Sequence, residues 1–333
     1  MRNYLFFGVI LLGACGGNMQ NPSQNAPAQT PSDQPYRYSG PDITPGASTG
    51  FAKEGDSVND VVDGTEFGSK ALSIFFHNSD LTPNSYQQAD ISTIYKSANE
   101  LDVVINGTVY PLTYDPDIAE FTRSDPEYAG EKVVSVFFDP QNEYAVFAST
   151  GVISSQPAHR SGEIFISAMG FTTDPTRLPA NASYSGEMEI STIPEAGAGD
   201  AAFGEVNFDA DFANGTMIGL VALRDEVGDT TGPIDLRDMD LTFKQAYFGS
   251  SNFDFFATGG SIVGNSFSLV VDASHDEWAK SGFTSAPNLT LIGSFFGPNG
   301  EFATGAGVGN GWAPGFNGST QVILLGTLNA AKN

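Results

Sequence analysis

The three histidines of this 333-residue chain are the side chains best suited to bind a metal or to act as a general base. They are His77, His159 and His275, and they are far apart in the sequence. No two of them have the spacing of neighbouring metal ligands, and the single cysteine, Cys15, is distant from all three. The segment His275–Trp278 places a base beside two acids and could bind a cation, although an ordinary surface loop explains the same residues.

Other patterns with a defined chemistry are also missing from the sequence. The run Asp209–Phe212 lacks the glycine and the terminal glutamate of a calcium-binding loop. No Gly-Lys-Ser/Thr phosphate-binding loop is present. The chain has 39 Asp and Glu, so pairs of carboxylates arise by chance and do not indicate a glycosidase. We therefore expect a protein that is not an enzyme, with no catalytic residue, no metal site and no cofactor.

The residues before Cys15 explain why a single cysteine lies so near the N-terminus. Arg2 is basic, and Tyr4–Leu12 is an apolar run too short to span a bilayer. The sequence Leu-Gly-Ala-Cys then ends at Cys15 and resembles a bacterial lipobox, which implies lipidation of that cysteine and cleavage before it. An ordinary signal peptide with an incidental cysteine is the alternative. We expect residues 1–14 to be a lipoprotein signal peptide and residues 15–67 to be the lipidated Cys15 with a disordered polar tether.

Composition and charge narrow the fold class and the partners. The formal net charge is −25, and such a surface repels phosphate backbones, so we expect no nucleic-acid partner. Hydrophobic residues make up 40% of the chain, which is enough to bury a core. The 38 glycines and 19 prolines, together with many aromatic residues, favour an all-β protein.

Residues 68–170 predict a β-rich domain. Asn106-Gly107 lies between two short apolar runs and indicates a hairpin with a type I′ turn. Asp139–Asn142 indicates the turn of a second hairpin. The segment Ser85–Glu100 fits either a helical turn or a long loop.

Residues 171–333 predict an antiparallel β-barrel. Val206, Phe208 and Ala210 alternate with polar, mostly acidic residues, which is typical of a strand with one buried face. About eight such runs follow one another, including Leu241–Phe248 and Gly260–Val263, and eight strands can close into a barrel filled by side chains.

The run Leu289–Phe296 has two distinct faces. Leu289, Leu291 and Phe295 share the face that we expect to point into the barrel, and Phe296 belongs to the other face. The glycines at positions 293, 297, 305 and 307 fit places where a strand bends or a large ring packs on bare backbone.

Four segments of this region resemble the barrel domain of transferrin-binding protein B: LPANASYSGEMEI, GEVNFDADFANGTMIG, GSIVGNSFS and GSFFGPNGEFATGAG. The residues that match the family pattern are Leu178, Pro179, Tyr184, Gly186, Phe295, Phe296, Gly297, Pro298, Glu301 and Gly305. The chain departs from the pattern at Phe302, Thr304 and Gly307. The same type of barrel occurs in factor H-binding protein. The resemblance implies an all-β fold in which residues 68–170 form a handle-like domain and residues 171–333 form an eight-stranded antiparallel barrel.

The same resemblance implies a function. We expect an outer-membrane-anchored surface lipoprotein that binds a ligand without catalysis, either an iron- or haem-carrying protein or a small solute. A surface-coat, adhesion or host-factor-binding module with no role in nutrient uptake is the alternative. The expected partners are the membrane through the N-terminal lipid, the unknown ligand, and an outer-membrane transporter or surface-export translocator. The folded part is expected to face the cell exterior, with the periplasm as the alternative.

Overall fold

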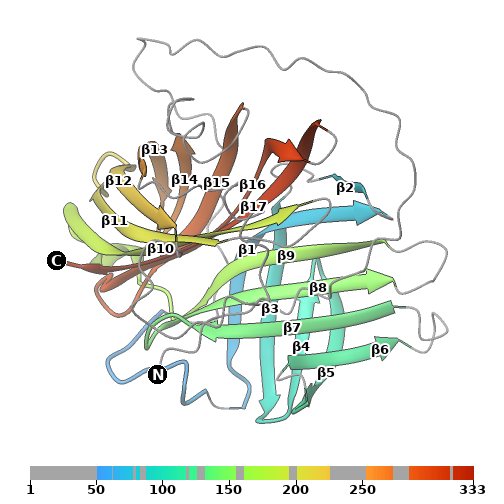
Figure 1. Cartoon of the computed structure of the whole chain (residues 1–333). Helices are drawn as coiled ribbons and strands as arrows, with labels where there is room; N and C mark the ends of the chain where they lie inside the picture. The colour runs from blue at the N-terminus through green and yellow to red at the C-terminus, as the bar shows by residue number, and fades with distance from the viewer. Residues whose placement is uncertain are drawn as a thin grey trace, which may run out of the picture.

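The computed structural model shows an all-β protein built from two closed antiparallel sheets (Figure 1). It describes residues 51–61, 63–77, 80–82, 88–117, 120–125, 132–154, 161–194, 201–225, 253–272, 285–315 and 318–333. The predicted signal peptide, Cys15 and the polar segment up to residue 50 lie outside these residues. The two closed sheets confirm the all-β class predicted from the sequence.

The first sheet closes because β1 pairs with β9 as well as with β3. The circuit runs β1-β3-β4-β5-β6-β7-β8-β9, and the short strand β2 pairs with the end of β1. The strands are β1 (Glu66–His77), β2 (Asp80–Thr82), β3 (Gln88–Ser97), β4 (Glu100–Ile105), β5 (Thr108–Asp115), β6 (Glu120–Asp125), β7 (Lys132–Pro140), β8 (Ala145–Ser154) and β9 (Ser161–Gly170).

The second sheet is a barrel of eight antiparallel strands in chain order, closed by the pairing of β10 with β17. This confirms the predicted eight-stranded antiparallel barrel. A 3-10 turn, Pro175–Arg177, precedes it. The strands are β10 (Asn181–Pro194), β11 (Ala201–Asp211), β12 (Thr216–Asp225), β13 (Phe253–Val263), β14 (Ser266–Asp272), β15 (Ser285–Phe296), β16 (Phe302–Gly315) and β17 (Gly318–Lys332).

Several details of the strands were predicted and others were not. Asn106 and Gly107 have φ values of 48° and 82°, as the expected type I′ turn requires. The segment left open between helical turn and loop contains β3, because Ala89, Ile91 and Thr93 alternate inward. The first domain is itself a closed sheet, which the sequence pattern did not specify. The predicted strand Leu241–Phe248 lies outside the described residues.

Each barrel has its own apolar core. The interior of the first barrel contains residues such as Phe67, Val103 and Phe165. The interior of the second contains residues such as Phe208 and Phe295. The burial of Val206, Phe208 and Ala210 with the exposure of their neighbours confirms the predicted two-faced strand.

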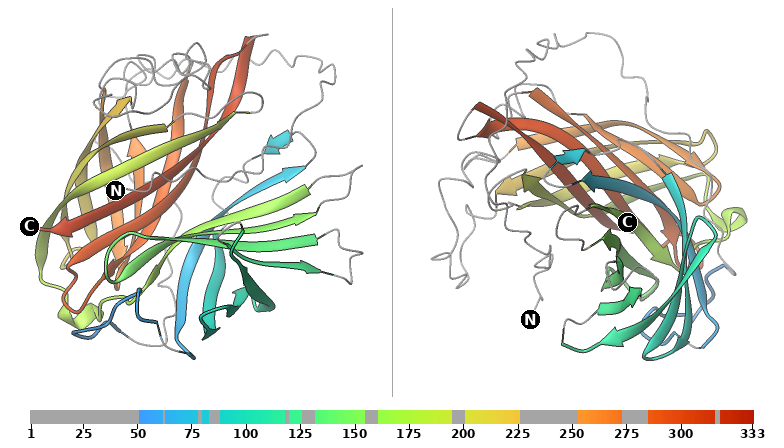
Figure 2. Two further views of the ribbon diagram at one scale, coloured as in Figure 1. Left: turned by 60° about the horizontal axis from the view of Figure 1, so that its bottom comes forward. Right: turned by 90° about the vertical axis from the view of Figure 1, so that its right-hand side faces the viewer.

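A third apolar cluster lies between the two barrels. Leu72, Phe147 and Ile166 of the first barrel pack there against outward-facing residues of β15, β16 and β17. At these positions the outer faces of the three strands are therefore buried rather than exposed. The two barrels lie side by side and diverge from a common junction (Figures 1 and 2).

Both barrels are closed by short turns at this junction. In the second barrel the turns 212–215, 264–265 and 297–301 all lie at one end. The first described N-terminal residues reach the same place, where Ala52 N donates to Thr172 O at 2.7 Å. The opposite ends of the barrels therefore point away from Ala52.

Candidate functional site

Tyr184 ties the first strand of the second barrel to the turn between β15 and β16. Its hydroxyl donates a buried hydrogen bond of 2.8 Å to Gly300 O. Its ring stacks on Phe208, with centroids 5.1 Å apart, and lies 5.5 Å from the ring of Phe295. Burial raises the pKa of this hydroxyl, and the Glu301 charge adds to the effect. Tyr184 is therefore a structural donor that stays protonated.

Glu301 holds the same turn from its outer side. Its carboxylate accepts hydrogen bonds from Asn299 N at 2.8 Å and from Asn299 Nδ2 at 2.9 Å. Lys332 Nζ donates to Asn299 O at 2.7 Å. Burial pushes the pKa of Glu301 upward, but the hydrogen bonds from Asn299 and the charge of Lys332 outweigh it and leave the pKa below its usual value.

Two glycines of the predicted motif are required by close packing or by the backbone. A Cβ at Gly186 would lie 2.0 Å from Asn329 O, so any other residue would push β10 away from β17. Gly297 has φ +86°, and a Cβ there would meet the Glu301 carboxylate at 2.4 Å.

The glycines of β15 and β16 let a large ring pack on bare backbone, as expected from the sequence. Gly293 and Gly305 are paired across these strands. The ring of Phe267 lies against both of them, because a Cβ at either position would be 2.5 Å or 3.1 Å from its Cζ.

The motif residues thus form the closed end of the second barrel and its contact with the first. Pro298 is buried within this turn. None of these residues offers an exposed nucleophile or acid-base pair. Their arrangement indicates that the motif stabilises the fold and does not form a catalytic site. Cys15, the predicted lipidation site, lies outside the described residues.

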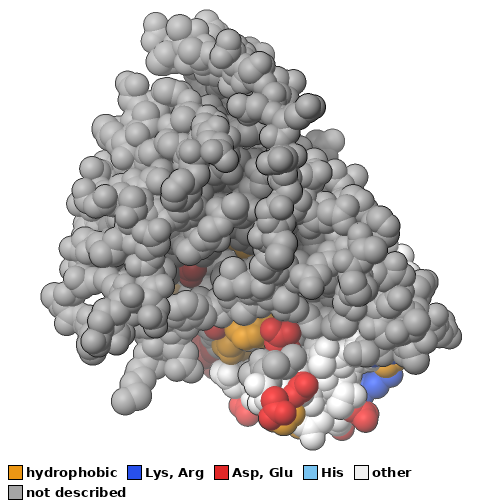
Figure 3. Space-filling view, turned by 45° about the vertical axis from the view of Figure 1, so that its right-hand side comes forward, with side chains coloured by type: hydrophobic (Ala, Val, Ile, Leu, Met, Phe, Trp, Pro, Cys, Tyr) orange, Lys and Arg blue, Asp and Glu red, His pale blue; other side chains and the backbone are white. Residues whose placement is uncertain are grey.

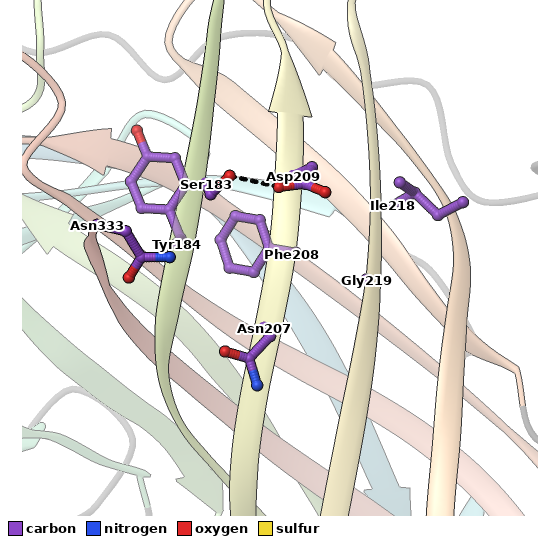
Figure 4. A pocket seen from close by; sticks show the side chains of 8 residues that line it. All are labelled: Ser183, Tyr184, Asn207, Phe208, Asp209, Ile218, Gly219 and Asn333. Atoms are coloured by element: carbon purple, nitrogen blue, oxygen red, sulfur yellow. Dashed lines mark hydrogen bonds between the residues drawn. The ribbon is translucent and has the colours of Figure 1, made fainter.

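An exposed depression on the outer face of β10, β11 and β12 is a candidate binding site among the described residues (Figure 4). Its volume is about 460 Å³. The residues that line it are Ser183, Tyr184, Asn207, Phe208, Asp209, Ile218, Gly219 and Asn333.

The strand register explains which of these side chains face outward. Ser183 on β10 is opposite Asp209 on β11, which is opposite Ile218 on β12. Tyr184 and Phe208 are next in the chain and turn into the barrel core. Asn207 lies two residues from Asp209 on the same outer face.

The depression combines polar acceptors with an exposed apolar side chain. Ser183 Oγ donates a hydrogen bond to Asp209 Oδ1 (Figure 4). Ile218 is 61% exposed and supplies an apolar surface beside these polar groups. Such a site can accept hydrogen bonds from N–H or O–H groups of a ligand and bury an apolar group beside them.

The sequence had indicated part of this site. Asn207 and Asp209 belonged to the face expected to point outward, but nothing marked them as a binding surface. Ile218 was detectable as an apolar residue at an outward position, once the turn at Asn214-Gly215 had fixed the register of β12. Tyr184 was predicted for its motif and not for this depression.

The structure brings no metal-binding cluster together within its described part, where no three His, Cys, Asp or Glu side chains converge. His159 and His275 lie outside the described residues. None of the described segments forms a helix long and apolar enough to cross a membrane. On the face seen in Figure 3, the described surface shows more acidic than basic side chains, in keeping with the charge of the chain.

The fold and the site together define a two-barrel all-β protein with a polar and apolar depression on its outer surface. No family model matches the chain, and a search of curated proteins finds no match. A search of solved structures finds similarity to structures of transferrin-binding protein B.

One of these structures is from Neisseria meningitidis, with 15% identity and a TM-score of 0.38; the match covers 81% of this chain and 44% of the other. Intact Ap-TbpB, with N and C lobes, has 17% identity and a TM-score of 0.37, covering 79% and 46%. A putative outer membrane protein from Bacteroides fragilis has 10% identity and a TM-score of 0.24, covering 81% and 97%. The chain spans less than half the length of the two transferrin-binding proteins.

Proposed function

We propose that this protein is an outer-membrane lipoprotein, anchored through Cys15, that binds a protein or small-solute ligand without catalysis. The observation that carries the binding role is the depression on β10, β11 and β12. It offers Asp209, Asn207 and Ser183 as polar groups beside the exposed Ile218.

Aromatic side chains inside the closed end of the second barrel support ligand binding on its outer surface. Tyr184, Phe208, Phe267 and Phe295 occupy that interior through ring contacts of 5.1 to 5.5 Å. Among the described residues, these rings leave no room for a ligand inside the closed end of the barrel. We therefore place ligand binding at this end on the outer surface.

The anchor rests on the sequence. Leu12, Gly13, Ala14 and Cys15 resemble a lipobox, and the polar run after them is long enough to lift a domain off the lipid. The folded part begins at the junction of the two barrels, and the depression lies on an outer wall away from the buried contact between them. Iron- or haem-carrying proteins are the ligand class implied by the sequence resemblance, and an outer-membrane transporter would be the receiving partner.

The test is direct binding with matched surface variants. Purified protein is immobilised, and haemoglobin, transferrin and free haem are passed over it. Ile218→Ser and Asp209→Asn should each weaken binding of the captured ligand at least about tenfold, as loss of a central contact does. Val263→Ser is the control, because Val263 is another exposed aliphatic of the same barrel, at 41% exposure, and does not line the depression.

The outcomes separate the proposal from its alternative. If all three variants bind equally well, the depression is not the site. If none of the probes binds and the protein instead attaches cells to a surface, the adhesion role replaces ligand capture.

A further inference from the structure

Three buried hydroxyls of the first barrel have no hydrogen-bond partner among the described residues. They are Ser73 Oγ, Thr150 Oγ1 and Ser167 Oγ, and their residues are between 0% and 2% exposed. Buried hydroxyls nearly always have a partner, because they give up their hydrogen bonds to water when the chain folds. The described part of the second barrel contains no side chain of this kind.

The strand register gathers these hydroxyls into one patch. Ser73 on β1 and Thr150 on β8 are the two cross-strand neighbours of Phe165 on β9. Ser167 follows Phe165 by two residues, so it lies on the same face and diagonal to both. The three side chains therefore surround one position on the barrel wall.

This patch faces the barrel interior. Ser73 alternates in phase with Phe67 and Ala71, and Ser167 alternates in phase with Phe165 and Met169. Thr150 alternates in phase with Val146 and Ala148, which also belong to the interior cluster. The hydroxyls are thus directed into the interior of the first barrel.

Large side chains in this interior gather toward the junction end. Phe67 contacts Phe171 at 5.0 Å and Tyr95 at 5.8 Å, and Tyr95 contacts Phe138 at 6.1 Å. Around the hydroxyl patch the wall has the small residues Ala71, Ala89 and Ala148 together with the larger Phe165 and Val136. The aromatic group forms a floor at the junction end, and the hydroxyls lie above it on the wall, with Ser167 nearest to the junction and Ser73 nearest to the opposite end of the strands.

The charges of the side chains near the hydroxyl patch limit the charge that a ligand could carry. The fully buried side chains of the patch are neutral. Asp102 is buried too, but it alternates out of phase with Leu101 and Val103 and pairs with Lys96 at 2.6 Å, so it belongs to the outer face. Glu163, half-buried two residues before Phe165 on the same face of β9, would repel an anion.

We propose that the first barrel binds a small neutral amphipathic molecule in its interior. A hydroxyl, carbonyl or amide group of the ligand exchanges hydrogen bonds with Ser73, Thr150 and Ser167, and its apolar body packs on Phe165 and the aromatic floor. Eight strands suffice to enclose one small ligand. This site is separate from the depression on the second barrel and does not depend on the proposed function of that surface.

Cysteine labelling tests whether small molecules reach the patch. Ser73→Cys and Ser167→Cys are made in the full chain, with Ala303→Cys as the control because Ala303 is fully buried in the filled second barrel. The folded proteins are treated with N-ethylmaleimide, and peptide mapping separates the new cysteine from Cys15. We expect labelling at positions 73 and 167 at least about tenfold faster than at 303. Equal protection of all three cysteines would overturn the proposal.

Binding of Nile red, a neutral dye with an apolar body and a carbonyl group, tests the hydrogen bonds. We expect one dye per chain, and an affinity about fivefold lower in Thr150→Val and in Ser73→Ala, the change that one lost hydrogen bond produces. Thr122→Val is the control, since the Thr122 hydroxyl donates to Val134 O at 3.3 Å and is not part of the patch. Lack of saturable dye binding would overturn the proposal, and so would an affinity that Thr150→Val and Ser73→Ala leave unchanged. Both outcomes are independent of the effect of Ile218→Ser on ligand binding at the second barrel.

Discussion

Phe295 and Phe296 are adjacent in the chain and fully buried, yet they belong to two different cores. Phe295 packs inside the second barrel, where its ring lies 4.7 Å from that of Phe212. Phe296 points the other way and packs against Ala145 and Ala168 of the first barrel. One strand end therefore stabilises the inside of one barrel and the contact between the two.

Both phenylalanines should be costly to truncate, for different reasons. Phe295→Ala and Phe296→Ala should each lower the free energy of unfolding by about 3–5 kcal/mol, as large-to-small changes in a core do. Chemical denaturation followed by fluorescence and by far-ultraviolet circular dichroism measures both. Phe296→Ala should also separate the unfolding of the two barrels, whereas Phe295→Ala should not. A Phe296→Ala variant as stable as the parent chain would contradict the packing between the barrels.

Removal of the Tyr184 hydroxyl should have a measurable cost. Tyr184→Phe leaves the buried Gly300 O without its donor, so we expect a loss of about 1–3 kcal/mol in the free energy of unfolding. Tyr114→Phe, at a half-buried tyrosine of the first barrel, should change stability by much less. Equal effects of the two variants in urea denaturation would argue against a role for the Tyr184–Gly300 bond.

Features of the fold that depend on residues close together in the chain could be predicted from the sequence, and features that depend on distant residues could not. Strict alternation fixed the faces of Val206, Phe208 and Ala210, and Asn106-Gly107 fixed a turn, because both signals act between close neighbours in the chain. The pairing of β1 with β9 joins residues about ninety positions apart, and no local pattern records it. The depression was missed for the same reason, since Ser183, Asp209 and Ile218 become neighbours only through register. The patch formed by the hydroxyls of Ser73, Thr150 and Ser167 could not be predicted either, because it depends on the pairing of strands that closes the first barrel.

Stability should fall at acid pH through Glu301. Its folded-state pKa is below the usual value of 4.5, because hydrogen bonds from Asn299 and the Lys332 charge outweigh the opposing effect of burial. A carboxyl group of this kind contributes stability above its unfolded pKa and loses it as the pH falls through the folded pKa. Thermal melts at several pH values below 5 should therefore decline less steeply for Glu301→Gln than for the parent chain. Glu205→Gln, which removes one charge from an exposed face of β11, controls for net charge, and a matching change in its profile would contradict the assignment.

The amide of Asn329 should couple the two barrels. It accepts hydrogen bonds from Asn142 Nδ2 at 2.9 Å and from Thr304 Oγ1 at 3.2 Å, and it donates to Gln141 O at 2.9 Å. Asn329→Ala removes all three, so we expect a loss of about 1–3 kcal/mol and less cooperative unfolding. Asn207→Ala, at an exposed asparagine of the second barrel, is the matched control in the same denaturation experiment. Unchanged cooperativity in Asn329→Ala would mean that the apolar contact suffices to couple the barrels.

Exposure on the cell surface is the prediction on which the proposed function depends most. Because the polar run between Gly16 and Gly50 is predicted to be a disordered tether, protease added to intact cells should cut it and release the folded barrels into the medium. The two closed sheets, whose backbone groups pair along every strand, should resist the same treatment. Cys15→Ser should abolish lipid labelling and release the protein from the membrane fraction without protease. If cleavage requires a permeabilised outer membrane, the protein faces the periplasm, and capture of an extracellular ligand is ruled out even though the anchor stands.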